Sequence, residues 1–386
     1  MQHKVIDAND VVIRFAGDSG DGMQLTGTLF ANMSAIYGNG LSTFPDYPAE
    51  IRAPKGTVAG VSGFQVHIGN HKVNTPGDFC DMLVAMNPAA LKANAKWLKR
   101  NALVLVNENA FDDLGMKKAG FTGNPFEELH IEDRTIICSP ITKLTEDSLK
   151  DSGLDVVSVH KCKNMFTLGM ACFIYERPLE FIYEYIEKKF KKKHPEMIAP
   201  NKKVVFDGYN YASNIQAVAD TYRVAPAPLE KGTYRNITGN QAAAWGLIAA
   251  AEKAHLPLFC GSYPITPATA ILEELAIHKN LNVKTMQTED EIAGICSAIG
   301  AAFAGNLAVT TTSGPGLSLK SEALGLAVMT ELPLVVIDVQ RSGPCTGMPT
   351  KTEQADLNEA LYGRNGESPM PVIAATSPTD CFSAAY

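Results

Sequence analysis

The chain has 386 residues, of which 46% are hydrophobic and 19% are charged. This composition supports a substantial core and excludes a globally disordered chain, and the length is typical of two domains. The formal net charge of −7 argues mildly against nucleic acid as the main partner. No apolar run approaches the length of a membrane span, and residues 1–10 lack the apolar stretch of a secretory signal. We therefore expect no membrane partner and a cytoplasmic location.

The eight cysteines are scattered along the chain, and none has the Cys-x-x-Cys spacing. Disulfides are not expected in a chain of this character. Iron–sulfur and zinc sites need clustered thiolates or imidazoles, which this sequence does not offer. We therefore expect no metal site in this chain, and any metal used in one-electron chemistry is expected on another chain.

The first half of the chain alternates segments that have the patterns of strands and helices. The expected strands are 11–16, 63–68, 82–86, 103–107 and 134–139, and the expected helices include 23–36 and 88–98. This alternation favours an α/β fold with a mainly parallel sheet and flanking helices. A proline-containing stretch at 223–232 has the character of a semi-extended linker. We expect a first domain over 8–200, a linker over 201–235 and a second domain over 236–386.

The second domain has the same alternation and the same expected fold class. Its expected helices are 239–254, 271–277, 291–304 and 318–330, and its expected strands are 256–260, 283–286, 307–312 and 334–339. The last residues, 382–386, have the pattern of the early part of a helix. We therefore expect this domain to be incomplete at its C-terminal end.

A glycine-rich turn, Gly17-Asp-Ser-Gly-Asp-Gly22, joins the first of these strands to the first helix. Glycines at such a turn let the backbone approach a phosphate, and the helix N-terminus favours anions. The spacing is neither G-x-G-x-x-G nor a P-loop, and Asp18 and Asp21 would repel an anion. Gly17, Gly20 and Gly22 therefore form either a purely structural turn or a contact with a nucleotide-bearing ligand.

A polar loop with three prolines spans residues 44–54 and carries Arg52. Loops on α/β scaffolds often hold binding groups. The Arg52 guanidinium is suited to clamp a phosphate or a carboxylate, and a structural salt bridge is an equal alternative.

The segment Tyr263-Pro-Ile-Thr-Pro-Ala-Thr269 follows an expected strand and precedes an expected helix. Its two prolines restrict the backbone, so that Thr266 is presented in a defined direction. The Thr266 hydroxyl is able to donate to a carboxylate near a helix N-terminus. By itself the segment is equally explained as a helix-capping turn.

Three consecutive carboxylates, Glu289, Asp290 and Glu291, lie at the expected start of the helix 291–304. Stabilisation by the helix dipole is one explanation. The other is that one carboxylate faces inward, where a raised pKa would let it share a proton with a heterocyclic nitrogen.

Two further loops follow strands of the second domain. Thr310-Thr-Thr-Ser-Gly-Pro-Gly316 is rich in hydroxyls and glycine, and the loop 340–350 carries Arg341. Ligands of open α/β sheets bind beyond the carboxyl ends of the strands, where Arg341 is expected. Arginine matches a carboxylate through paired hydrogen bonds, although a structural role for Arg341 stays open.

Four segments of the second domain, taken in order, resemble the alpha subunit of the 2-oxoacid:ferredoxin oxidoreductases. They are Tyr-Pro-Ile-Thr-Pro from 263, Glu-Asp-Glu-Ile-Ala-Gly from 289, Thr-Thr-Ser-Gly-Pro-Gly from 311, and 340–357. The first domain, with 17–22 and 48–52, resembles the gamma domain of that family. The fused arrangement and the segment 341–357 are most similar to the 2-oxoglutarate branch. The resemblance extends from about Val11 to the end of the chain.

The resemblance implies that a 2-oxoacid and coenzyme A are converted to acyl-CoA, CO₂ and two electrons for ferredoxin. For the 2-oxoglutarate branch the product is succinyl-CoA, and the reverse reaction uses the same site. Pyruvate or a branched-chain 2-oxoacid is the alternative substrate. A non-catalytic module that binds coenzyme A or a nucleotide is the alternative from another class.

Thiamine diphosphate is the cofactor that the resemblance implies, with its aminopyrimidine end on this chain. Glu291 matches the carboxylate that hydrogen-bonds the pyrimidine ring and promotes its imino tautomer. Tyr263, Pro264 and Ile265 belong to the same expected cofactor site.

The substrate residues follow in the same way from the family motifs. Thr266 matches the hydroxyl that touches the 2-oxo-carboxylate, and Arg341 matches the arginine that pairs with it. These roles suit the residue types, because such pairing holds the oxoacid near the reacting cofactor. Thr346, Thr350 and Lys351 are candidates to bind the distal carboxylate of a dicarboxylic substrate.

The resemblance also implies a beta subunit that holds the diphosphate, its Mg²⁺ and at least one 4Fe–4S cluster. The chain is then expected to be inactive alone and to act in an α2β2 heterotetramer that reduces ferredoxin. The gamma domain of the family is associated with coenzyme A, which makes Gly17, Gly20, Gly22 and Arg52 candidate contacts for it.

Overall fold

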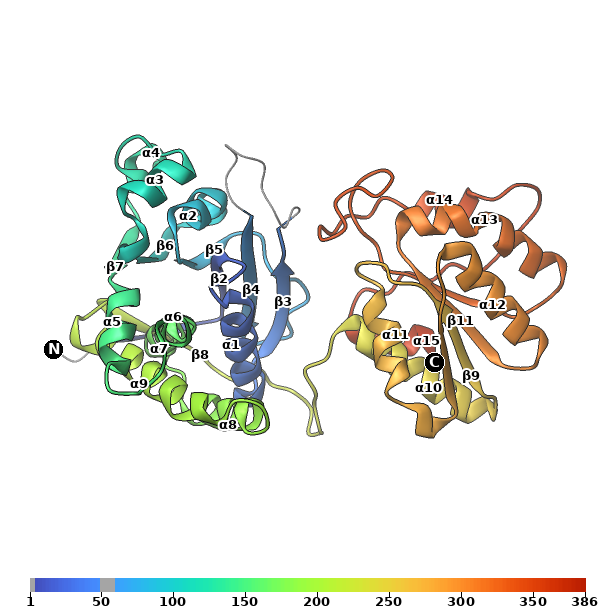
Figure 1. Ribbon diagram of the computed structural model, residues 1–386, viewed down its shortest axis with the longest axis horizontal. Coiled ribbons are helices and arrows are strands. Elements are labelled where there is room, and N and C mark those ends of the chain that lie inside the picture. The colour runs from blue at the N-terminus through green and yellow to red at the C-terminus, as the bar shows by residue number, and fades with distance from the viewer. Residues whose placement is uncertain (1–3, 49–59) are drawn as a thin grey trace. The chain divides into compact units, whose positions relative to one another are not determined.

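A computed structural model of the chain describes residues 4–48 and 60–386 (Figure 1). The chain divides into two compact units, residues 1–233 and 234–386. Each unit is an α/β domain with its own sheet, which confirms the expected fold class.

The first unit is built on a six-stranded sheet with the order β3-β4-β2-β5-β6-β7. The pairings β2–β5, β5–β6 and β6–β7 are parallel, and only β4 runs antiparallel to both of its neighbours in this sheet. The expected mainly parallel sheet is therefore present, with one reversed strand that the sequence pattern did not reveal. The strands are β2 (Asp10–Asp18), β3 (Gly40–Asp46), β4 (Val61–Gly69), β5 (Cys80–Ala85), β6 (Leu98–Asn107) and β7 (Thr135–Ser139).

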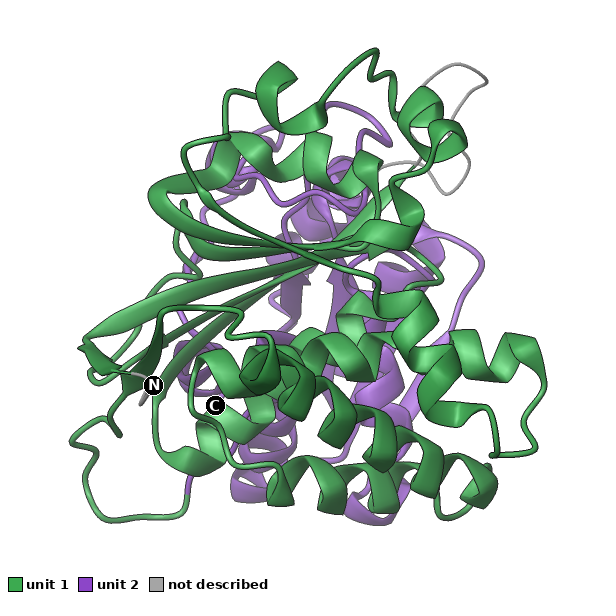
Figure 2. Cartoon of the chain, turned by 90° about the vertical axis from the view of Figure 1, so that its left-hand side faces the viewer, with its two compact units in different colours: residues 1–233 green, residues 234–386 purple. Residues whose placement is uncertain are grey.

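Both faces of this sheet are buried, as the residues of β2 illustrate. Val11, Ile13 and Phe15 belong to one hydrophobic cluster, whereas Val12 and Ala16 belong to another. Successive side chains of a strand point to opposite faces, so the apolar run of β2, interrupted by the buried Arg14, is explained by helices on both sides. Figure 2 shows the sheet of this unit between two layers of helices.

One layer of the first unit contains α1, α7, α8 and α9, and α2 lies on the opposite face. The helices of this unit are α1 (Met23–Tyr37), α2 (Pro88–Asn94), η1 (Ala95–Trp97), η2 (Glu108–Ala110), α3 (Asp113–Ala119), α4 (Pro125–Glu128), α5 (Ile141–Leu149), α6 (Val156–His160), α7 (Lys163–Ile174), α8 (Glu180–Phe190), η3 (Pro195–Met197) and α9 (Ile198–Asn214).

The linker expected at 201–235 is wrong for most of its length. Residues up to Asn214 belong to α9, whose residues Val204 and Val205 are buried against α7. Strand β8 (Asp220–Val224) then pairs in parallel with β1 (Lys4–Ala8). The proline-rich texture begins only after β8, and the partners of α9 and β8 are too distant in sequence for a local pattern to reveal.

The second unit is built on a four-stranded, fully parallel sheet with the order β10-β9-β11-β12. Helices α10 and α11 cover one face, and α12 and α13 pack in a separate apolar cluster. The elements are α10 (Gly239–Ala254), β9 (Leu258–Ser262), α11 (Thr269–Ala276), η4 (Lys279–Leu281), β10 (Val283–Gln287), α12 (Glu291–Phe303), β11 (Leu307–Thr312), α13 (Gly314–Met329), β12 (Val335–Asp338), α14 (Leu357–Tyr362) and α15 (Pro378–Ala385).

The carboxyl ends of these four strands lie side by side. Ser262 is paired with Gln287, and Thr312 with Asp338, so the segments that follow the strands leave from one edge. From β9 the chain continues through α11 to β10 on one side, and from β10 through α12 to β11 on the other side of β9. A ligand site at this edge is the general expectation for such a sheet.

The expected helix at 382–386 is part of α15, which packs on α10. A side chain at Gly246 of α10 would lie 2.5 Å from the Phe382 carbonyl oxygen, so the close approach of these helices requires a glycine there. Across the described ranges 4–48 and 60–386, no helix combines the length and apolarity that crossing a membrane requires.

Candidate functional site

The site of the second unit begins at Tyr263, which directly follows β9. Its side chain is 4% exposed, and its hydroxyl lies 3.1 Å from Oγ1 of Thr312 at the end of β11. Burial raises the pKa of the Tyr263 phenol, and the nearby Glu291 carboxylate raises it further. Tyr263 therefore presents a neutral hydroxyl, which is able to donate a hydrogen bond.

Gly316, in the first turn of α13, has no side chain and so allows these polar groups to approach its backbone closely. A Cβ atom at this position would collide with the Tyr263 hydroxyl and Thr312 Oγ1 and would lie 3.0 Å from Cγ of Glu291. Three side chains from three different segments thus converge on the backbone of one glycine. The motif 310–316 pointed to this turn, but the sequence did not assign Gly316 a role of its own.

Glu291 is the first residue of α12, but it does not cap the helix. Asp290 does so, because its Oδ1 accepts a hydrogen bond from the Ala293 backbone N–H at 2.8 Å. Asp290 therefore caps the helix and lies at the positive end of its dipole, which was one explanation for these carboxylates. The half-buried Glu291 side chain lies beside Tyr263 and Gly316 instead.

Lys320 of α13 is a residue of this site that the sequence analysis missed. Its side chain is fully buried, and its Nζ donates to the Glu291 carbonyl at 2.6 Å and to Thr310 Oγ1 at 3.3 Å. The ammonium also lies 5.0 Å from the centroid of the Tyr263 ring. Burial lowers the pKa of Lys320 to about 8. The sequence did contain a signal, because Lys320 follows the apolar Leu317 by three residues and therefore lies on the same face of the helix.

Arg341 joins the Tyr263 segment to the loop that follows β12. Its side chain is buried, with Nη1 donating to the Thr266 carbonyl at 2.8 Å and Nη2 to the Thr346 carbonyl at 3.1 Å. Nε of Arg341 is buried and has no hydrogen-bond partner within the described part of the chain. A buried donor of this kind is costly unless a ligand satisfies it.

Thr266 is brought to Arg341 through its backbone carbonyl, and its side chain is exposed. The local turn is closed by Thr269, whose hydroxyl accepts from the Ile265 N–H at 2.8 Å and donates to the Ile265 carbonyl at 2.9 Å. Pro264 is exposed in the same segment, and the Thr266–Pro267 peptide bond is cis. The alternative for this segment was a helix-capping turn, but α11 has Ala268 as its N-cap with no side-chain cap hydrogen bond, and the turn is closed by Thr269.

The three candidates for a distal carboxylate lie on one loop. Thr346 is exposed, whereas Thr350 and Lys351 are half-buried. The loop is braced by the Ser342 N–H, which donates to the Lys351 carbonyl at 2.8 Å. Their contact with a substrate stays a prediction.

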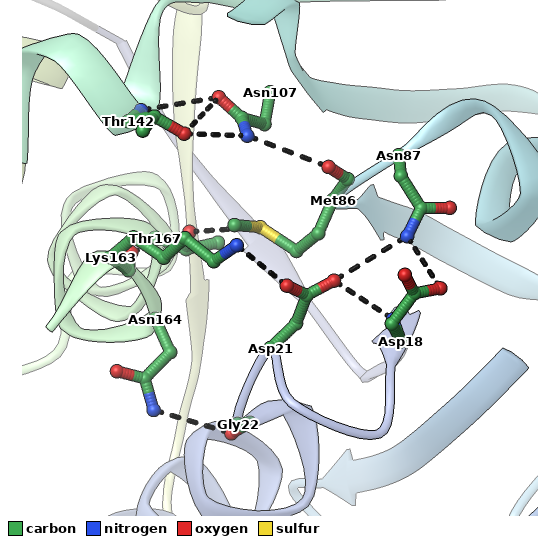
Figure 3. Close-up of polar contacts among 10 residues, drawn as sticks. All are labelled: Asp18, Asp21, Gly22, Met86, Asn87, Asn107, Thr142, Lys163, Asn164 and Thr167. Carbon is green, nitrogen blue, oxygen red and sulfur yellow. Dashed lines mark hydrogen bonds and ion pairs between the residues drawn. The ribbon is translucent and has the colours of Figure 1, made fainter. Parts of the chain in front are cut away.

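The glycine-rich turn of the first unit is occupied by its own side chains (Figure 3). Oδ2 of Asp21 accepts from the Asp18 backbone N–H at 2.8 Å and from Asn87 Nδ2 at 3.4 Å. Oδ1 of Asp21 pairs with Lys163 Nζ at 2.6 Å. The backbone N–H that a phosphate would use is therefore satisfied by a carboxylate of the turn itself. Burial and the Asp21 charge raise the pKa of Asp18.

Two of the three glycines in this turn have structural explanations. A Cβ atom at Gly17 would lie 2.6 Å from Oδ2 of Asp21, and one at Gly22 would collide with the Asn164 amide. Gly22 also has a φ of 72°, which favours glycine. Gly20 faces open space. Arg52, the other candidate contact in this unit, lies outside the described residues.

Two family comparisons cover most of the chain. Residues 12–211 match the family "Pyruvate ferredoxin/flavodoxin oxidoreductase", and residues 250–386 match "Pyruvate flavodoxin/ferredoxin oxidoreductase, thiamine diP-bdg". The expected resemblance is therefore confirmed in both units.

Curated relatives and a solved structure agree with these matches. The chain is 54% identical over 376 residues to the 2-oxoglutarate oxidoreductase subunit KorA of Mycobacterium tuberculosis, covering 97% of this chain and 57% of that protein. It is 33% identical over 265 residues to subunit alpha of 2-oxoacid:ferredoxin oxidoreductase 2 of Aeropyrum pernix, covering 64% of this chain and 40% of that one.

One similar solved structure is the 2-oxoglutarate:ferredoxin oxidoreductase from Magnetococcus marinus with 2-oxoglutarate, coenzyme A and succinyl-CoA bound. The TM-score is 0.79 at 32% identity, covering 98% of this chain and 60% of the other. The chain thus spans little more than half the length of the Mycobacterium and Magnetococcus proteins. The chain belongs to the pyruvate ferredoxin/flavodoxin oxidoreductase family.

Proposed function

We propose that this chain is the alpha-type subunit, with a fused gamma-type unit, of a 2-oxoglutarate:ferredoxin oxidoreductase. The reaction converts 2-oxoglutarate and coenzyme A to succinyl-CoA and CO₂ with reduction of ferredoxin, or runs in reverse. The observation that carries the proposal is the convergence of Tyr263 and Glu291 on Gly316, with buried Arg341 joined to the same segment. The similarity to the Mycobacterium and Magnetococcus proteins supports the choice of 2-oxoglutarate.

The residues at this edge fit the pyrimidine half of thiamine diphosphate. The Glu291 carboxylate and the neutral Tyr263 hydroxyl lie together at the backbone of Gly316, and both are able to hydrogen-bond the polar edge of an aminopyrimidine ring. In the described ranges, no group of three or more His, Cys, Asp or Glu residues is placed to hold a metal ion. We propose that the diphosphate, its Mg²⁺ and a 4Fe–4S cluster are bound by a beta subunit. When bound, thiamine diphosphate supplies the carbanion chemistry of decarboxylation.

The roles of this chain's own residues follow from their positions. Glu291 holds a proton at a ring nitrogen of the cofactor, and Tyr263, Pro264 and Ile265 line the same position. Lys320 fixes the first residue of α12 through the Glu291 carbonyl.

Substrate binding is assigned to the segments that Arg341 joins. The unpartnered Nε of Arg341 and the Thr266 hydroxyl face the 2-oxo-carboxylate in this proposal. Thr346, Thr350 and Lys351 bind the distal carboxylate, because they share the loop with Arg341.

The first unit is assigned the contact with coenzyme A. Asp21 already satisfies the Asp18 N–H, so the proposed contact at Gly17, Gly20 and Gly22 uses neutral groups of coenzyme A, with Gly20 as the open position. The Arg52 contact remains part of this proposal. An α2β2 assembly and a cytoplasmic location complete it.

The experiment is purification of this chain co-expressed with its beta subunit, followed by oxoacid-dependent reduction of a viologen dye. We expect a brown complex that prefers 2-oxoglutarate over pyruvate and branched-chain oxoacids. A preference for pyruvate would overturn the substrate assignment. A colourless preparation without a second subunit would overturn the assembly.

A matched pair of variants tests the catalytic assignment. Glu291→Gln is expected to abolish 2-oxoglutarate-dependent CO₂ release, because its amide cannot hold the proton. Glu289→Gln, two residues away and exposed, is the control and is expected to leave the rate unchanged. If both variants retain activity or ligand binding equally, the non-catalytic binding module becomes the better description.

A further inference from the structure

The loop that carries Arg341 begins at the half-buried Asp338 and ends at the buried Asp356. Asp338 is the last residue of β12, and Asp356 directly precedes α14. Asp356 is 4% exposed, and its Oδ1 accepts a hydrogen bond from Gln340 Nε2. The loop between the two carboxylates therefore has a defined base, formed by residues 338, 340 and 356.

The side chains of Asp338 and Asp356 are hydrogen-bonded to each other, and a hydrogen bond between two carboxyl groups needs a proton. Oδ1 of Asp338 and Oδ2 of Asp356 are both buried, and neither has a hydrogen-bond donor among the residues that the structure describes. Two carboxylates in contact cannot both be ionised without strong repulsion, so one proton shared between them is the stable arrangement.

The groups around Asp338 favour its protonated form. Burial raises the pKa of Asp338 to about 8, and the hydrogen bond with Asp356 and the charges of Asp356 and Glu359 raise it as well. Glu359 of α14 accepts a hydrogen bond from Ser318 of α13. The buried cations of this unit are Lys320 and Arg341. Lys320 donates to the Glu291 carbonyl, and Arg341 donates to the carbonyls of Thr266 and Thr346.

The charge that remains is best placed on Asp356. A Cβ atom at Gly314 would lie 3.2 Å from Oδ2 of Asp356, so this carboxylate faces the N-terminus of α13. The positive end of a helix dipole stabilises an anion there. Asp338 is then the donor and Asp356 the acceptor.

The loop above this base is braced internally. The Ser342 hydroxyl donates to Oε2 of Glu353 at 2.6 Å, and the Ser342 N–H donates to the Lys351 carbonyl at 2.8 Å. A braced loop moves as one body about its base. Opening the base therefore displaces Arg341 from the Thr266 carbonyl.

We propose that Asp338 and Asp356 form a proton-sharing clasp whose closure positions Arg341. The two aspartates are positioning residues, since they act through Arg341 and the backbone of its loop. Loss of the shared proton to solvent sets two carboxylates against each other and opens the base. The effect on substrate binding rests on the proposed function, whereas the clasp itself does not.

The kinetic test uses the co-expressed complex with Asp338→Asn, which keeps a hydrogen-bond donor toward Asp356 but cannot titrate. For the wild type we expect KM for 2-oxoglutarate to rise above about pH 8, approaching about tenfold per pH unit, with a smaller change in kcat. For Asp338→Asn we expect a flat KM over the same range. Glu367→Gln, an exposed carboxylate, is the matched control and is expected to follow the wild type.

A second measurement does not depend on turnover. A carboxyl group with a raised folded pKa contributes stability at low pH that is lost as pH rises, here from about 4 to about 8. Thermal unfolding of Asp338→Asn should therefore improve relative to the wild type across this range and stay level above it. Asp356→Asn should show the same trend, which covers the case in which one variant fails to fold.

The outcomes separate the two proposals. A wild-type complex without any 2-oxoacid turnover would refute the proposed function, while the unfolding series would still test the clasp. Variants that track the wild type in the pH dependence of unfolding would refute the clasp. An active complex with a wild-type KM profile in Asp338→Asn would refute its link to Arg341.

Discussion

The two units present the same kind of glycine-rich turn between a strand and a helix, but the polar groups around the two turns differ. In the first unit, the space at Gly17 and Gly22 is taken by the unit's own Asp21 and Asn164, and Asp21 is fully paired. In the second unit, the space at Gly316 is likewise taken by Tyr263 and Thr312, but the same edge also holds the buried Nε of Arg341, which has no partner among the described residues. Glycines therefore report that something approaches the backbone closely, and it is the unpartnered donor that distinguishes a candidate ligand site.

The largest expected effect comes from removing this space in the second unit. Gly316→Ala should reduce 2-oxoglutarate turnover by about 100-fold or more, because the added methyl group displaces Tyr263 and Glu291. The same substitution at Gly325, in the same helix, adds a Cβ atom with nothing within 4 Å and should leave turnover unchanged. Steady-state rates of the two complexes measure the contrast, and equal losses would show that an added methyl group disturbs this helix in general.

Lys320→Met should come next, with a loss of about tenfold in turnover, because the Glu291 carbonyl and Thr310 lose their common donor. Burial lowers the pKa of Lys320 to about 8, so below that pH the folded protein carries a buried charge. Wild-type stability should therefore gain on the variant as pH rises from about 8 to about 10.5. Chemical denaturation at several pH values checks this, and a constant difference would contradict it.

Opening the glycine-rich turn of the first unit should lower its stability and create a binding site for an anion. Asp21→Ala removes the partner of Lys163 and should lower the free energy of unfolding by about 1–3 kcal/mol. It also leaves the Asp18 N–H and the Lys163 ammonium available to an anion. Titration with inorganic phosphate should detect binding that the wild type lacks. Absence of binding in a folded variant would mean that the turn is closed for other reasons as well.

The smallest effect separates Thr269 from Thr266. Thr269→Val should cost about 1 kcal/mol of stability, since its hydroxyl closes the turn at Ile265. Thr266→Val should leave the melting temperature unchanged and raise KM for the oxoacid. If the two variants exchange these phenotypes, Thr269 is not the residue whose hydroxyl closes the turn.

Local patterns were sufficient for the second unit. The boundaries of α10 and β11 follow directly from periodicity and end signals, and the order of motifs indicated the family. The antiparallel strand β4 and the pairing of β1 with β8 were not predictable, because partner choice between distant segments leaves no local signature.

The candidate site divides in the same way. Glu291 and Arg341 were predicted as site residues because their residue types stand in recognisable motifs, and the structure places both at the carboxyl edge of the second sheet. Lys320, Asp338 and Asp356 were missed, because burial changes what such residues do and a sequence does not show burial. The role of Asp21 was hidden for the opposite reason, since an acidic residue in a glycine turn was taken only as a repulsive charge.

The pairing of β1 with β8 has a consequence for how such proteins are assembled in evolution. Lys4 lies opposite Asp220, and Ala8 lies opposite Val224, so the path into the first unit runs beside the path out of it. Because the first and last strands of the module pair with each other in a sheet of their own, a gene joined or split after β8 leaves the six-stranded sheet uncut. The fused order of the two units is thus one that recombination can create, or undo, without redesigning either interior.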